Sequence, residues 1–166
     1  ACIATLAEAS WIKPVKKYLI SIYPMILFIA FLFLIVSFEL HVYPWYKHQG
    51  HWLNAKFFIA RNFIILIITF VLARKFTKES CKESEKQHRY AVLYLLSFVC
   101  SQSFIAFDWI MPLDYPWVST LFGGYFFIEA IYAGMALAGF FCFIQLRNTV
   151  GAQHVVPLRD FATLMF

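Results

Sequence analysis

The sequence predicts an all-α protein built as a polytopic bundle of transmembrane helices. Of its 166 residues, 62% are hydrophobic and only 14% are charged, whereas a soluble domain averages about 25% charged residues. A larger core does not account for the excess, because a soluble domain of this size still leaves about a third of its unfolded surface in water. Four long apolar segments fit helices in lipid instead, since a spanning helix needs about 20 mostly apolar residues.

Each apolar segment is predicted to form one spanning helix. The segments cover residues 18–40, 57–73, 90–111 and 118–146. None shows the strict alternation of a barrel strand, and hydrocarbon admits only helices or closed barrels. Pro24 lies early in the first helix, where a mild kink is expected but no break is required. On the fourth helix, Ala130, Gly134 and Ala138 form a small-residue stripe that lets a neighbouring helix approach closely.

The remaining residues complete the predicted organisation. Residues 1–17 are expected to form a lead-in, residues 18–146 the four-helix bundle, and residues 147–166 a connection followed by the start of a further helix. The chain begins without Met and ends inside an apolar run. We therefore expect it to be a stretch of a longer subunit.

Basic residues are divided unequally between the two ends of the predicted bundle. The end that holds the N-terminus and the segments 74–89 and 147–159 carries Lys13, Lys16, Lys17, Arg74, Lys75, Lys78, Lys82, Lys86, Arg89, Arg147 and Arg159. The other end has only Lys47 and Lys56, with Arg61 just inside the second helix. The positive-inside rule places the crowded end in the cytoplasm. Since the basic residues form no stripe, they indicate a lipid bilayer as partner and no nucleic acid.

Charged side chains inside the predicted helices are the candidate functional residues, because each costs about 2.5–3.5 kcal/mol near the bilayer centre on insertion scales. Glu39, Arg61 and Asp108 lie near the non-cytoplasmic end. Arg61 is expected to neutralise Glu39 or Asp108, either to hold a polar head group or protons, or as a structural ion pair. Glu129 lies some 15 Å along the fourth helix, close to the midplane. It is either a proton relay or a neutral structural acid.

Other chemistries have little support in the sequence. The four cysteines are widely spread and have no CxxC spacing for zinc or an iron–sulfur cluster. The five histidines lie in loops or at helix ends, so neither a haem held within the bundle nor a loop metal site through His48 and His51 is favoured. No nucleophile elbow, metalloprotease helix or phosphate-binding loop is found. We expect no catalytic residue, no metal and no covalently bound cofactor, and the broken helices of a secondary transporter are not apparent.

One stretch resembles a known family. Residues 107–123 read Phe-Asp-Trp-Ile-Met-Pro-Leu-Asp-Tyr-Pro-Trp-Val-Ser-Thr-Leu-Phe-Gly and resemble a stretch of the ActF subunit of alternative complex III, a bacterial quinol:electron-acceptor oxidoreductase. Weaker likeness covers residues 54–61 and 158–166. Tyr115 and Pro116 stand where the family usually has Pro and His, Pro112 replaces Ser, and Glu129 stands where a small residue is expected.

The resemblance implies a subunit similar to the NrfD and polysulfide-reductase membrane anchors. Such a subunit lies in the bacterial cytoplasmic membrane, contributes to binding menaquinone or ubiquinone or to proton conduction, and is not catalytic alone. The expected partners are a related NrfD-like subunit and subunits that carry iron–sulfur clusters and haem c. The candidates for the quinone or proton path are Asp108, Arg61, Glu39, Glu129 and Asp114. The alternative function is a scaffold that only anchors those partners.

Overall fold

The structure, a computed structural model, describes residues 2–6, 13–82, 84–148 and 163. Every regular element among these residues is a helix. Within the described ranges, four segments are long and apolar enough to cross a membrane, namely Lys16–Phe38, Ala55–Cys81, Lys86–Asp114 and Phe122–Phe141. The predicted all-α, multi-pass membrane architecture is thereby confirmed. The expected start of a further helix lies outside the described residues, apart from Thr163.

The first spanning segment contains an interruption. After the short α1 (Cys2–Leu6), α2 runs over Lys13–Ser21 and α3 over Met25–Phe38, with a turn at residues 22–24 between them. Pro24 has no N–H to donate and its ring crowds the preceding turn. The backbone tightens accordingly, and Met25 N donates to Ile22 O at 2.9 Å. The helix is thus interrupted here, beyond the mild kink that was expected.

The second and third spanning helices extend beyond their predicted bounds. α4 covers Ala55–Cys81 and begins where the Asn54 side chain accepts a hydrogen bond from Lys56 N. Its last two turns are polar, so hydropathy alone placed its end too early. α5 (Lys86–Ile105) continues through a π-helical turn, η4 (Ala106–Ile110), into a 3₁₀ helix, η5 (Met111–Asp114).

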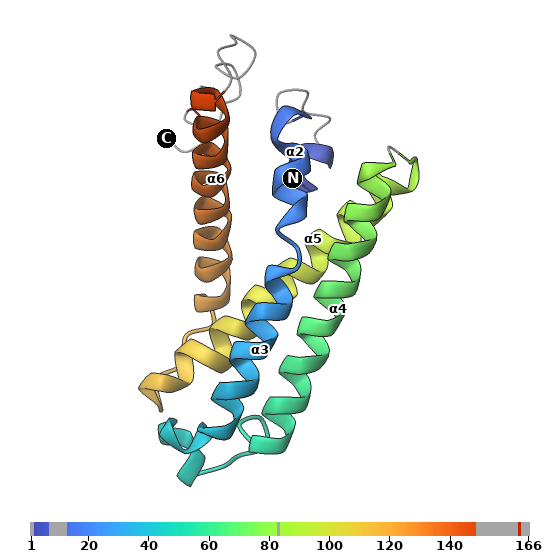
Figure 1. Cartoon of the computed structure of the whole chain (residues 1–166). Helices are drawn as coiled ribbons and strands as arrows, with labels where there is room; N and C mark the ends of the chain where they lie inside the picture. Colours follow the sequence, from blue (N-terminus) through green and yellow to red (C-terminus); the bar gives the residue numbers. More distant parts are fainter. Residues whose placement is uncertain (1, 7–12, 83, 149–162, 164–166) are drawn as a thin grey trace.

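The fourth helix, α6 (Phe122–Asn148), returns beside α5. The first turn of α6 packs close to Phe107 because residue 123 is a glycine. A Cβ added to Gly123 would lie 2.9 Å from the Phe107 ring. α4 packs mainly on α5, α3 packs on α4, and α6 contacts α5 and α2. In Figure 1 the N-terminal segment, the α4–α5 connection and the C-terminal end of α6 lie at one end of the molecule. This arrangement matches the predicted up-and-down topology.

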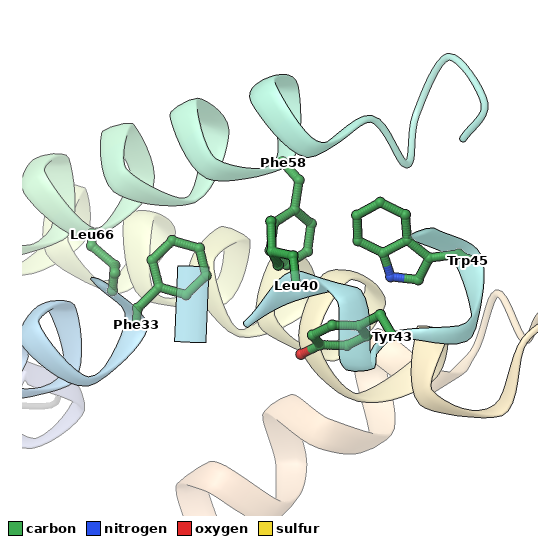
Figure 2. Close-up of a cluster of buried hydrophobic side chains, with 6 residues drawn as sticks. All are labelled: Phe33, Leu40, Tyr43, Trp45, Phe58 and Leu66. Carbon is green, nitrogen blue, oxygen red and sulfur yellow. The ribbon is translucent and has the colours of Figure 1, made fainter. Parts of the chain in front are cut away.

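The opposite end of the molecule, here called the distal end, holds the larger of the two buried hydrophobic clusters found among the described residues. The chain after α3 forms two short 3₁₀ helices, η2 (Leu40–Val42) and η3 (Pro44–Lys47), which fold back over the helix ends. They bring Leu40, Tyr43 and Trp45 against residues of α3 and α4 (Figure 2). Trp45 is fully buried. It is therefore a core residue, although tryptophan in a connection between spanning helices is typical of an interfacial aromatic belt.

Candidate functional site: a buried ion pair beside an apolar groove

The ion pair predicted for Arg61 forms with Asp108. Arg61 Nη2 donates to Asp108 Oδ1 at 2.6 Å, and Arg61 Nε donates to Asp108 Oδ2 at 2.9 Å. The two parallel bonds are the fork geometry that makes Arg–carboxylate pairs strong and directional. The Asp108 side chain is fully buried, and the Arg61 side chain is only 8% exposed. Of the two acids considered for Arg61, the structure selects Asp108.

Local backbone geometry places each partner. Arg61 lies between the second and third turns of α4, on the face that also carries the buried Phe58 and Asn62. Asp108 lies in the middle of the π-helical turn η4. A π-turn accommodates one extra residue and so changes which face the following side chains occupy, which is why such turns recur at functional sites.

Neighbouring side chains satisfy the remaining oxygen lone pairs of Asp108. Asn62 Nδ2 donates to Asp108 Oδ2 at 2.9 Å, and Trp52 Nε1 donates to Asp108 Oδ1 at 3.3 Å. The carboxylate therefore accepts four hydrogen bonds. A buried carboxylate is expensive unless it is paired and bonded in this way. The guanidinium is also held by aromatic rings, with its carbon 4.0 Å from the Trp52 ring centroid and 4.7 Å from that of Phe57.

A second set of contacts connects the ion pair to Trp109. Because Asn62 directs its NH₂ group to Asp108 and to the Phe58 carbonyl, its side-chain oxygen faces the other way. This oxygen accepts a 2.8 Å hydrogen bond from Trp109 Nε1. The Trp109 ring in turn stacks on Phe33, with the ring centroids 4.9 Å apart and the planes 2° from parallel.

An apolar groove lies on the far side of this stack. It has a volume of about 390 Å³ and is lined by Ile29, Leu32, Phe33, Val36, Tyr43, Ile105 and Trp109. Leu32 and Val36 are themselves exposed on α3, so the groove opens on the lipid-facing surface. Ligand pockets commonly have volumes of about 300–1,000 Å³ and apolar walls with few polar groups.

Tyr43 supplies a polar group to the wall of the groove. Its hydroxyl donates to the Trp109 carbonyl at 3.1 Å, which leaves the phenol oxygen able to accept a hydrogen bond. Burial raises the pKa of the Tyr43 phenol, and the negative charge of Asp108 raises it further. The phenol is therefore a neutral donor and acceptor at physiological pH.

The other predicted site residues lie away from the ion pair. Glu39 follows the end of α3 and is 3.4 Å from His41 Nδ1, both side chains being about two-thirds exposed. Asp114 is exposed in η5. Glu129 is exposed on α6 and accepts a 2.7 Å hydrogen bond from the Tyr125 hydroxyl. Since α6 begins at Phe122, Glu129 lies about 10 Å into the helix, compared with the predicted 15 Å.

Sequence reasoning missed four members of the site. Asn62 follows Arg61 and is a polar side chain in an apolar run, a signal that predicts a buried contact. Trp109 has no sequence signal of its own beyond its place in the family-like stretch 107–123. Tyr43 and Trp52 lie in a connection between spans, where aromatic residues are typical of the membrane interface, and nothing in the sequence shows that the 41–54 segment folds back onto Asp108.

Comparison with family models, curated proteins and solved structures finds no match to this chain. The likeness to ActF therefore stays an expectation based on residues 107–123. The same stretch contributes Asp108 and Trp109 to the site.

Proposed function

We propose that the chain is a membrane subunit of a respiratory quinol:electron-acceptor oxidoreductase of the alternative complex III type, and that the groove beside Trp109 holds the quinone ring. The observation that supports this most is the position of the groove. It opens toward lipid, where quinones reside, and its inner wall contains the Tyr43 phenol, whose hydroxyl bonds to Trp109, the residue after the buried Asp108. The chain does not catalyse quinol oxidation alone, because electrons must leave through redox groups on partner subunits.

The proposed role of the groove is to bind and orient the quinone ring. An apolar wall of α3 and α5 side chains suits the ring and the first isoprenoid carbons of a quinone. A quinol hydroxyl donates a hydrogen bond to the Tyr43 oxygen, while the Tyr43 O–H continues to donate to the Trp109 carbonyl. Asp108 and Arg61 act on the groove indirectly. Asp108 fixes the orientation of Asn62, and Asn62 in turn holds Trp109.

A groove-filling variant tests the proposal in the intact complex. Leu32→Trp enlarges an exposed groove residue, so it should fill the groove without disturbing the core. We expect the KM for a short-chain quinol to rise at least tenfold, with complex assembly unchanged. Leu34→Trp is the matched control, since Leu34 is equally exposed on α3 but does not line the groove. Unchanged quinol kinetics in Leu32→Trp would refute a quinone site here.

A membrane scaffold is the second candidate function. The observation that favours it is the complete hydrogen bonding of Asp108, which leaves its carboxylate no free acceptor for substrate. Under this alternative, groove variants leave quinol turnover unchanged, whereas variants of Asp108 prevent the partner subunits from assembling. Tyr43→Phe separates the two functions as well. It should slow turnover at least tenfold under the quinone hypothesis and leave it unchanged under the scaffold hypothesis.

A further inference from the structure

We infer that the face of α6 around Glu129 docks a transmembrane helix of another subunit, and that this helix presents an arginine or lysine to the Glu129 carboxylate. The inference is independent of the proposed quinone site, which lies between α3 and α5.

The α6 face is the most open of the four spanning segments. Only 6% of the α6 span is buried, against 28% for the α4 span. Ile128 is 66% exposed and Tyr132 is 52% exposed. Apolar side chains alone would simply face lipid. The Glu129 carboxylate lies among these apolar side chains, and a charged group is costly to expose to lipid.

Glu129 lies within the apolar span of α6, Phe122–Phe141. It is about 10 Å from the start of α6, whereas the hydrocarbon layer of a membrane is about 30 Å thick. Ionisable groups at such depth almost always face protein or a water-filled cavity and pair with another group. Tyr125 satisfies one carboxylate oxygen with a 2.7 Å hydrogen bond. In the part of the chain that the structure describes, no cation pairs with Glu129.

The surface beside the carboxylate is shaped to admit a helix. Ile128, Glu129, Tyr132 and Ala133 line an open groove of about 470 Å³. Ala133, which lines this groove one turn after Glu129, has a small side chain. Small residues at such a position let two helix backbones approach closely.

Charge complementarity selects a different subunit over a second copy of this chain. Copies in one membrane share the same orientation, so a copy must offer a cation at the depth of Glu129. Among the described spans, the basic residue set within an apolar stretch is Arg61, about 9 Å into α4. It already pairs with Asp108 and is buried. Two copies facing each other through α6 would only bring two carboxylates together.

Site-directed photocrosslinking in native membranes tests the inference. Tyr132→p-benzoylphenylalanine places the probe on the proposed face, and Phe31→p-benzoylphenylalanine is the control on the exposed face of α3. We expect Tyr132, and not Phe31, to crosslink to one other polypeptide, at a spanning peptide that contains Arg or Lys. A crosslink to a further helix of this same polypeptide, to a copy of this chain, to lipid only, or to a span without a cation would overturn the inference.

Two further variants measure the role of the carboxylate. Glu129→Gln keeps the side-chain shape and the Tyr125 contact but removes the charge, so crosslink yield should fall roughly three- to tenfold. Ala133→Phe fills the groove and should lower the yield without changing charge. Exchanging the two charges, with Glu129→Arg here and the reverse change in the partner, should restore it. If both Glu129→Gln and Ala133→Phe leave the yield unchanged, no partner docks on this face.

Discussion

Removing either member of the Arg61–Asp108 pair should destabilise the bundle strongly, and removing both should cost much less. Asp108→Leu leaves the Arg61 guanidinium buried without its counter-ion. Breaking a buried pair in this way costs about 3–5 kcal/mol, whereas replacing both partners by apolar residues is often nearly neutral. We therefore expect a double-mutant cycle with Arg61→Leu to give a coupling free energy above about 2 kcal/mol.

The structure argues for the upper part of that range for Asp108→Leu. The change strands three buried donors at once, namely Arg61 Nε, Arg61 Nη2 and Asn62 Nδ2. The Trp52 donor is counted separately, since half of Trp52 is exposed and its N–H has access to other partners. Asn62 keeps its bond to the Phe58 carbonyl, so only the hydrogen directed at Asp108 loses its acceptor.

The measurement is helix content followed by circular dichroism while SDS displaces a mild detergent. The Glu39–His41 pair provides the matched control, because its exposed side chains predict a cost below about 1 kcal/mol for Glu39→Leu. Additive costs for Asp108→Leu and Arg61→Leu would refute the reasoning. A cost for Asp108→Leu no larger than that of Glu39→Leu would do the same.

Three smaller predictions concern other parts of the fold. Gly123→Ala should lower the free energy of unfolding by about 1–3 kcal/mol in the same titration, because its Cβ would meet the Phe107 ring where α6 packs on α5. Gly134→Ala is the control: its Cβ would lie in open space, so it should not destabilise the isolated chain. The exposed Cys81 should react with an impermeant thiol reagent only from the cytoplasmic side, and labelling in intact cells would contradict that orientation. Burial raises the pKa of the Cys2 thiol to about 12, so Cys2 should stay unlabelled at pH 8 until detergent unfolds the chain.

Hydropathy and charge were sufficient to predict the architecture of this protein. A helix in lipid must satisfy its own backbone and be apolar for about 20 residues, so each span is visible in sequence without reference to the others. Helix ends were less accurate because they depend on polar residues. α4 continues to Cys81 through the mostly polar residues 74–81, and α6 begins at Phe122, four residues after the predicted start at residue 118.

The candidate site was only partly predictable, because its members come from three separate segments. The cost of a charge in hydrocarbon identified Arg61 and Asp108, which are 47 residues apart. Their shared neighbours depend on two backbone features without a clear sequence signature. One is the π-helical turn that rotates Asp108 and Trp109, and the other is the fold-back of the 41–54 segment that brings Tyr43 and Trp52 to the pair.

The hydrogen-bond network of Asp108 and the apolar groove are connected through Asn62 and Trp109. With Asp108 present, rotating the Asn62 amide by half a turn would set its oxygen against the carboxylate and its NH₂ against the Trp109 N–H, so the observed orientation is strongly favoured. Trp109 is thereby held flat against Phe33, and this stack forms the wall of the groove. Loss of Asp108 should free Asn62 to rotate and loosen that wall even if no quinone ever touches the carboxylate. An effect of an Asp108 variant on quinol binding therefore does not make Asp108 a proton acceptor, whereas variants of Leu32 and Tyr43 act on the groove directly.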